Sequence, residues 1–176
     1  LLDAQCASAQ FSTITPGWCI GGLSANQGGS GSGWGPLGAI YNPYSIVADS
    51  TYIYVVQYNG HIVTRHRIDT GAYAGWIGGL NTSKPSGPGS PDLQGNGCET
   101  MANYTHTPGW CYGGVSRAVG NYPALGFYYP RAAALAMSND GTTEYLYVGD
   151  RGGVHRYNAT TGAYLGWIGR VYVNGA

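Results

Sequence analysis

Short runs of four to seven residues that carry apolar and β-branched side chains follow one another along much of the chain, separated by turn residues such as glycine, asparagine and aspartate. Runs bounded in this way are typical of short β-strands. Helical periodicity is absent apart from Arg131–Met137, whose short length and flanking turns favour a buried strand. Eight runs occur: Ser45–Ala48, Tyr52–Gln57, Ile62–Ile68, Tyr73–Ile77, Ala132–Ala136, Tyr145–Gly149, Gly153–Tyr157 and Tyr164–Ile168. The pattern predicts an all-β protein with four short strands in each half.

The two halves of the chain are copies of one repeat. Cys6–Gly22 matches Cys98–Gly114 at 9 of 17 positions, and Val63–Gly78 matches Val154–Gly169 at 10 of 16. Repeats of this kind stack because one unit alone cannot bury its apolar face. We predict a first β repeat at residues 1–81, a linker rich in Pro, Gly and Ser at 82–97, and a second β repeat at 98–176.

Each copy resembles one blade of an NHL-type β-propeller over its four predicted strands. The resemblance rests on a proline before the first strand, on Tyr147-Val148-Gly149-Asp150, on Val154 with Arg156, and on the closing Thr-Gly and Gly-Trp-Ile-Gly motifs. It implies two tandem blade-like, four-stranded antiparallel units, either propeller-like or stacked. A propeller ring needs about four to eight blades. The two units therefore belong to a longer array, assemble with units of other chains, or join in a different β arrangement.

The four cysteines occupy matching places in the two copies. Cys6 and Cys19 are separated by twelve residues, and so are Cys98 and Cys111. This spacing predicts one disulfide-closed loop per copy, and a closed loop of this size contributes about 3 kcal/mol through the entropy of the unfolded chain. A zinc site is the alternative, but the close Cys or His pairs typical of zinc are absent from the sequence. Four free thiols are a further alternative, which the symmetry disfavours.

Charged residues are scarce, at 9% of the chain, and the formal net charge is zero. Lys84 is the only lysine, so we expect neither nucleic acid nor anionic lipid as a partner. No apolar stretch approaches the length of about 18 residues that a membrane span requires. The disulfides predict an extracellular or cell-surface location. Because the sequence begins Leu1-Leu2, we expect any signal peptide to have been removed or to lie outside it.

Three Asn-X-Ser/Thr sequons are candidate glycosylation sites, at Asn81, Asn103 and Asn158. Attached glycans would help to explain how a chain with so few charges stays in solution. The linker at 82–97 is a further candidate for O-linked sugars.

Candidate catalytic groups do not form a recognisable constellation. The histidines His61, His66, His106 and His155 do not recur between the copies, so we expect structural or surface positions for them. The aspartates Asp49, Asp69, Asp140 and Asp150 lie at predicted turns, where carboxylates cap backbone N–H groups. A nucleophile elbow and a phosphate-binding loop are both missing from the sequence. We therefore predict that the protein is not an enzyme and has no metal or other cofactor.

The tandem repeat and the unclosed number of units favour a structural role. We expect an extracellular subunit that assembles with itself into a glycosylated filament or surface array, by stacking of β units or by strand exchange. Val171, Tyr172 and Val173 alternate like a strand and are the candidate segment for exchange, because an unpaired strand invites another sheet edge. The recurring tryptophans favour packing between units. The alternative function is a secreted propeller-like module whose aromatic residues bind carbohydrate or protein.

Overall fold

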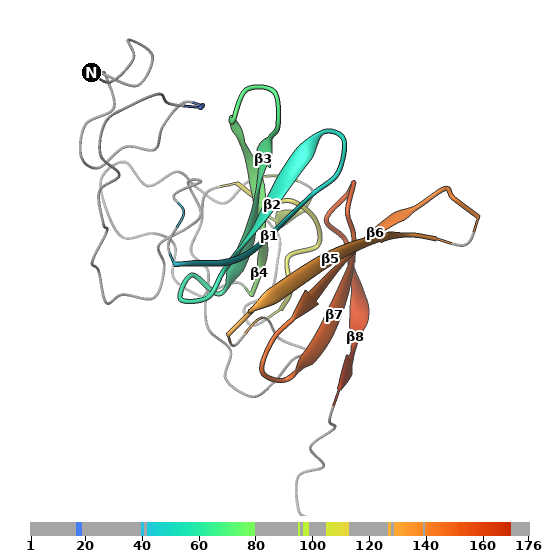
Figure 1. Ribbon diagram of the computed structural model, residues 1–176. Coiled ribbons are helices and arrows are strands. Elements are labelled where there is room, and N and C mark those ends of the chain that lie inside the picture. Colours follow the sequence, from blue (N-terminus) through green and yellow to red (C-terminus); the bar gives the residue numbers. More distant parts are fainter. Residues whose placement is uncertain are drawn as a thin grey trace, which may run out of the picture.

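The computed structural model describes residues 17–18, 40, 42–79, 95, 97–98, 105–112, 127, 129–138 and 140–169. These residues form two antiparallel four-stranded sheets, with strand orders β1-β2-β3-β4 and β5-β6-β7-β8 (Figure 1). The strands are β1 (Pro43–Ala48), β2 (Tyr52–Gln57), β3 (Ile62–Arg67), β4 (Tyr73–Gly78), β5 (Ala132–Met137), β6 (Glu144–Gly149), β7 (Gly153–Asn158) and β8 (Tyr164–Gly169). The predicted all-β class and its two four-stranded units are confirmed. Among the described residues, no helix has the length and apolar character needed to cross a membrane.

Turn aspartates hold the connections between the strands. In the β1–β2 turn, Asp49 Oδ1 accepts the backbone N–H groups of Thr51 and Tyr52 at 2.5 and 2.6 Å. In the β6–β7 turn, Asp150 Oδ1 accepts the corresponding groups of Gly152 and Gly153 at 2.7 and 3.0 Å. Carboxylates stabilise tight turns in this way because they satisfy donors that no strand partner can reach. The capping role predicted for these aspartates is confirmed.

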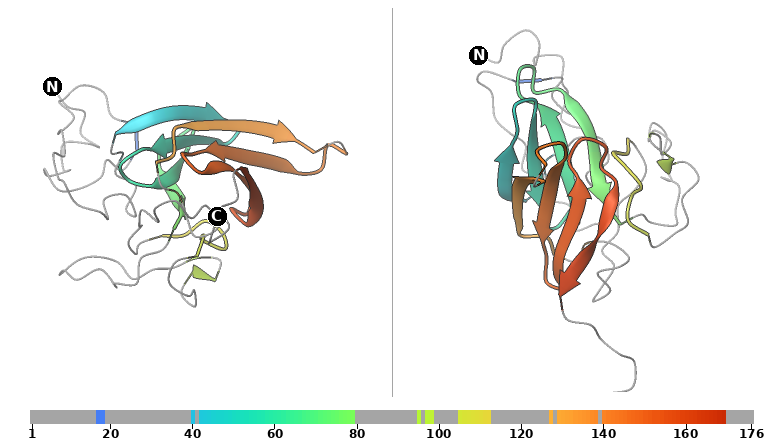
Figure 2. Two further views of the ribbon diagram at one scale, coloured as in Figure 1. Left: turned by 90° about the horizontal axis from the view of Figure 1, so that it is seen from below. Right: turned by 90° about the vertical axis from the view of Figure 1, so that its right-hand side faces the viewer.

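The two sheets pack against each other and share one core. Their first strands, β1 and β5, lie side by side, and the other strands of each sheet extend to the same side of this pair (Figure 2). The Ala133 N–H on β5 donates to Ser45 Oγ on β1 at 3.3 Å. The shared apolar core consists of Tyr54, Val56, Val63, Ile77, Trp110, Phe127, Leu146, Val148, Tyr157 and Ala159. The repeats are therefore joined by a common hydrophobic core.

Several predicted sites lie outside the described residues. They are Cys6 and Cys19 of the first predicted disulfide, the sequons at Asn81 and Asn103, and the candidate exchange segment Val171, Tyr172 and Val173. The second predicted disulfide, between Cys98 and Cys111, is present.

Candidate functional site: the contact between the two repeats

A segment of the second repeat, residues 105–112, lies along the outer edge of the first sheet. Trp76 on β4 and Cys111 exchange both of their backbone hydrogen bonds, each at 2.9 Å. Farther along the edge, the Thr107 N–H donates to Gly78 O at 2.9 Å, and Thr107 Oγ1 accepts the Gly78 N–H at 3.3 Å. Edge strands expose unpaired backbone groups. The second repeat satisfies those groups on β4.

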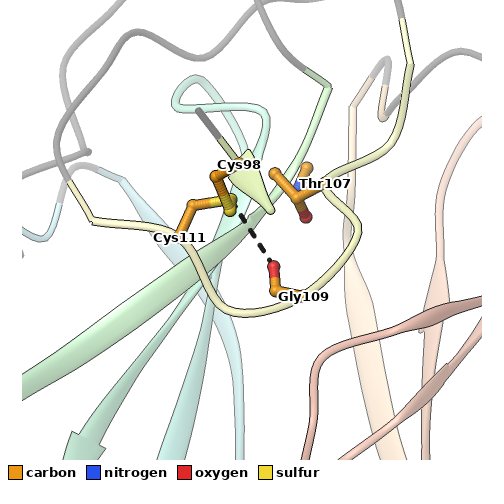
Figure 3. The surroundings of a disulfide bond; sticks show 5 residues. Cys98, Thr107, Gly109 and Cys111 are labelled. Carbon is orange, nitrogen blue, oxygen red and sulfur yellow. Dashed lines mark hydrogen bonds between the residues drawn. A yellow bond between two sulfur atoms is a disulfide. The ribbon is translucent and has the colours of Figure 1, made fainter. Parts of the chain in front are cut away.

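The Cys98–Cys111 disulfide fixes this segment in place (Figure 3). Both cysteines are buried with Ile62 and Trp76 in a second, smaller apolar cluster beside β3 and β4. Cys111 Sγ lies 3.6 Å from Gly109 O, which is a packing contact because a disulfide sulfur carries no proton to donate. The bond closes the loop of the second repeat, and the loop covers the edge of the first sheet. The disulfide therefore contributes to the contact between the repeats as well as to its own loop.

Trp18 and Trp110 make the same contact in the two repeats, each on the turn before the last strand of its own sheet. In both cases, the backbone N–H and the indole N–H donate to carbonyl oxygens of that turn. The pairs are Trp18 N–H to Thr70 O (3.0 Å), Trp18 Nε1–H to Ile68 O (2.8 Å), Trp110 N–H to Thr161 O (3.2 Å) and Trp110 Nε1–H to Ala159 O (2.9 Å). The Pro-Gly-Trp motif is thus a repeated docking element for the Thr-Gly turn.

Glycine is required where this docking occurs. Gly71 and Gly162 have φ values of 72° and 76°, in the left-handed region that L side chains rarely adopt. A Cβ at Gly71 would lie 2.6 Å from the backbone nitrogen of Trp18, and one at Gly162 would lie 2.5 Å from that of Trp110. The recurring Thr-Gly pair is therefore explained both by backbone conformation and by the close approach of the tryptophan.

Arg65 on β3 is buried at the centre of the contact. Its guanidinium lies between two aromatic rings, 4.5 Å from the centroid of Tyr52 and 4.4 Å from that of Trp110. Nε donates to Ala74 O in its own sheet at 2.8 Å, and Nη1 donates to Thr160 O in the second repeat at 3.1 Å. A buried charge is tolerated only when it is hydrogen-bonded or paired. Arg65 therefore needs the second repeat for both an acceptor and a ring.

Tyr54 on β2 also lies against Trp110, with ring centroids 5.7 Å apart. Its hydroxyl donates to Asp49 Oδ2 at 2.5 Å. Burial of the ring and the nearby Asp49 carboxylate raise the pKa of the Tyr54 hydroxyl far above its usual range. Tyr54 thus stays neutral and remains a donor at physiological pH.

The face of sheet 1 that meets the second repeat has a counterpart on sheet 2, which we call the arginine face. It consists of Val63, Arg65 and Ile77 in the first repeat, and of Val154, Arg156 and Ile168 in the second. Val63 and Ile77 are 0% exposed, whereas Val154 is 37% and Ile168 is 74% exposed. Arg156 is exposed and lies over the ring of Tyr145 at 5.1 Å, as Arg65 does over Tyr52. One arginine face is covered and the other is open.

The opposite side of the contact is also present twice, and we call it the tryptophan face. It consists of Trp110, Ala133 and Ala159 in the second repeat, and of Trp18, Ile46 and Ile68 in the first. The match of Ile46 to Ala133 follows from the strand register, since Ile46 pairs with Val55 as Ala133 pairs with Val148. Trp110 and Ala159 are buried, whereas Trp18 is 55% and Ile46 is 64% exposed, and Ile68 is also exposed. The first repeat therefore carries an open tryptophan face.

A cluster of buried polar and aromatic side chains fills the second repeat between the cysteine loop and sheet 2. His155 Nε2 lies 3.2 Å from Asp150 Oδ2, and both side chains are excluded from solvent. His106 Nδ1 and the Tyr157 hydroxyl are 2.5 Å apart, and the His106 ring stacks on Tyr164 at 3.9 Å. Burial and the nearby Asp150 raise the pKa of Tyr164 to about 12. Because solvent does not reach the His155–Asp150 pair, its place in the fold is that of a core element.

The histidines do not assemble a ligand set. Among the described residues, no group of three or more His, Cys, Asp or Glu side chains is arranged to hold a metal ion. His155 Nδ1 and the Tyr164 hydroxyl are buried and have no hydrogen-bond partner within the described part of the chain. The rings of His106 and His155 lie 5.0 Å apart, centroid to centroid. Their approach was not predicted, because their counterparts in the first repeat are Ile14 and Thr64 and the repeat therefore gave no signal.

Asn158 is the one predicted glycosylation site among the described residues. It ends β7, its side chain is half-buried, and its Oδ1 accepts the Thr161 N–H at 2.8 Å. The next residue, Ala159, is buried in the contact between the repeats. The sequon therefore borders that contact.

Arg65 and Arg156 are the contact residues to which sequence reasoning assigned no role, although Arg156 belongs to the blade-like motif. Both stand in the middle of a short β-strand at the same repeat position, and this recurrence is a signal that could have identified them. Comparisons with protein families, with curated proteins and with solved structures give no match for this chain.

Proposed function

We propose that the protein is an extracellular structural subunit, which assembles with itself into a glycosylated filament or surface array through its β units. The observation that carries the proposal is the difference between the two arginine faces. Ile77 is fully buried in the first repeat, whereas Ile168 at the same position of the second is 74% exposed. An exposed apolar surface of this kind is typical of an interaction site.

The energetics of burial favour assembly through this surface. Complete burial of one large aliphatic side chain is worth about 1.5–3 kcal/mol relative to its exposure. The open arginine face offers Val154 and Ile168, and the open tryptophan face offers Ile46, Ile68 and Trp18. Covering both faces in an assembly removes this apolar surface from water, by stacking of units or by exchange of a strand such as Val171–Val173.

The extracellular setting is supported by the Cys98–Cys111 disulfide, because such bonds persist in oxidising compartments. Glycans on Asn81, Asn103 or Asn158 would supply the polar surface that the few charged residues do not. The proposal includes no catalytic step.

The test is the oligomeric state of the full chain, produced in a secretory host that forms disulfides and attaches glycans. We expect sedimentation velocity to show species that grow with protein concentration, and electron microscopy to show regular polymers or arrays. Mass spectrometry of the same sample reports whether the sequons carry sugar. A chain that stays monomeric at all concentrations overturns the proposal.

A carbohydrate-binding module is the second candidate, because Trp18 is 55% exposed and aromatic faces stack on sugars. A monomer that binds sugars on a glycan array through Trp18 would support this function in place of assembly.

A further inference from the structure

We infer that the open arginine face of one copy docks onto the open tryptophan face of another copy, so that the chains join head to tail. The inference rests on the proposed function and names the contact through which the subunits assemble. The partner is a second copy of this chain, because the contact between the two repeats already shows how these faces fit together.

The internal contact is the template. It joins the arginine face of the first repeat, with Val63 and Ile77, to the tryptophan face of the second, with Trp110 and Ala159. The two remaining faces of the chain are the other members of the same two types. A contact between copies therefore continues an interface that the fold already contains.

Arg156 has half of the environment that encloses Arg65. The guanidinium of Arg65 is held between Tyr52 and Trp110, whereas that of Arg156 lies over Tyr145 with no second ring from the described part of the chain. The ring that Arg156 lacks corresponds to Trp110, whose counterpart in the first repeat is the exposed Trp18. Docking would place Trp18 of another copy over Arg156, a cation–π contact worth about 0.5–2 kcal/mol.

The backbone acceptor for this arginine is present as well. Thr160 O accepts Arg65 Nη1 in the internal contact, and Asp69 occupies the same position in the first repeat. The Asp69 carboxylate is paired with Arg67, which donates to it at 2.9 and 2.7 Å and holds the pKa of Asp69 at about 2. An incoming Arg156 would therefore meet the backbone carbonyl oxygen of Asp69, next to a carboxylate whose charge Arg67 already balances.

The space that docking requires is open. Gly75 and Gly166 have φ values of 117° and 118° at the same position of β4 and β8. A Cβ at Gly75 would lie 3.2 Å from the Trp110 side chain, whereas at Gly166 nothing in the described part of the chain comes within 4 Å. The place beside Gly166 is thus where Trp18 of another copy would fit.

A carboxylate repulsion in the internal contact is missing from the contact between copies. Glu144 of the second repeat lies near Asp49 of the first, and this neighbour together with burial raises the pKa of the Glu144 carboxyl. By the strand register, Ala136 takes the place of Asp49 in the contact between copies, and Thr51 takes the place of Glu144. The new contact therefore lacks the pair of carboxylates that the internal contact brings together.

The contact is heterologous, because the two surfaces that meet are different. A heterologous contact closes into a ring when its rotation closes and otherwise continues as a filament. A ring uses both open faces of every subunit, and a filament uses both faces of every subunit except the two at its ends. The interface is therefore tested by blocking one face at a time.

The experiment uses two variants of the full chain, Ile168→Arg on the arginine face and Ile46→Arg on the tryptophan face. A charge forced into an apolar contact without a partner should weaken that contact at least about 100-fold. Each variant alone is expected to sediment as a monomer and to melt like the wild type at a concentration that prevents assembly, because each changed side chain is exposed. An equimolar mixture is expected to form dimers only, through the one intact face of each type.

Met137→Arg is the matched control, because Met137 is 53% exposed at the end of β5 and belongs to neither open face. This variant is expected to assemble like the wild type. The inference is overturned if the wild type assembles and either single variant still assembles as well, or if the mixture stays monomeric. Dimers formed by Ile46→Arg alone would likewise overturn it, since they would show that two arginine faces pair with each other. A wild-type chain that never assembles refutes the proposed function itself, so the two failures are distinct.

Discussion

Ile77 and Ile168 occupy the same position in the last strands of the two sheets, but their surroundings differ. Ile77 lies in the core shared by the repeats, whereas Ile168 is largely exposed. The strand pairings around them are equivalent, since Val63 pairs with Ile77 as Val154 pairs with Ile168. The difference shows that the burial of an arginine face depends on the next repeat and not on the sheet that carries it.

The edges of the two sheets differ in the same way. On β4, Trp76 exchanges backbone hydrogen bonds with Cys111 of the second repeat and is fully buried. On β8, the matching Trp167 is only half-buried. One cysteine loop therefore covers the sheet of the preceding repeat while its tryptophan docks on its own sheet. A repeat built in this way is completed by its successor.

Truncation of Ile77 and of Ile168 should give the largest difference between the sheets in the free energy of unfolding. We expect Ile77→Ala to lower the free energy of unfolding by about 2–5 kcal/mol, because it leaves a cavity in the shared core. The matched Ile168→Ala should change it by less than about 0.5 kcal/mol in the monomer, because the side chain is already in water. Urea unfolding of both variants at a concentration that prevents assembly measures the two values. Equal losses would mean that Ile168 is covered within one chain.

Removal of the Cys98–Cys111 disulfide should reduce the difference in amide hydrogen exchange between the outer strands of the two sheets, β4 and β8. We expect the double change Cys98→Ala and Cys111→Ala to cost about 3 kcal/mol, the entropy of the loop that the bond closes. Hydrogen exchange should then become faster at the Trp76 amide and approach the rate at Trp167, because the Cys111 carbonyl no longer stays at the edge. Exchange at Trp76 that is unchanged would show that other contacts hold the loop on β4.

Alanine substitution of the two turn glycines, Gly71 and Gly162, tests whether Trp18 and Trp110 dock on their turns in the same way. Gly71→Ala and Gly162→Ala each place a Cβ in the left-handed region, at a cost of about 1–2 kcal/mol, and against a tryptophan backbone nitrogen. We expect each variant to lose at least this amount of unfolding free energy, measured by thermal or urea unfolding. A loss confined to Gly162→Ala would contradict the equivalent docking of Trp18 and Trp110.

The strands and their order along the chain could be predicted because short apolar runs and the turn residues between them are local signals. All eight predicted runs are strands, with differences of one or two residues at their ends, such as β1 beginning at Pro43. The Cys98–Cys111 bond followed from equal spacing in the two copies. These features depend on residues that are near one another in the sequence or that repeat.

The contact between the repeats could not be predicted, because it depends on how two twisted sheets pack in space. Spacing pairs Cys98 with Cys111 but does not show that their loop lies on β4 of the other repeat. The burial of Arg65 likewise depends on Trp110 and Thr160, which are distant in sequence. The sequence shows equal arginines at positions 65 and 156, and only the packing separates the enclosed one from the exposed one.

Neutralisation of Glu144 should give the smallest effect on the free energy of unfolding, and it tests the Glu144–Asp49 pair of carboxylates in the internal contact. Burial and then the nearby Asp49 raise the pKa of Glu144 above its unfolded value. Such a group favours folding below the unfolded pKa of about 4.3 and loses that contribution as pH rises through the folded pKa. Relative to the wild type, Glu144→Gln should therefore be more stable at pH 7 than at pH 4.

We expect the Glu144→Gln difference to be below about 0.5 kcal/mol, because a half-exposed charge is screened by solvent. Urea unfolding of both proteins between about pH 4 and pH 7 measures it. The control is the same substitution in an Asp49→Asn background, where the neighbouring carboxylate is absent while the amide oxygen can still accept the turn N–H groups. The pH dependence should be smaller there, because only burial still acts on Glu144. A pH dependence of unchanged size would show that Glu144 responds to its burial alone and not to Asp49 of the neighbouring repeat.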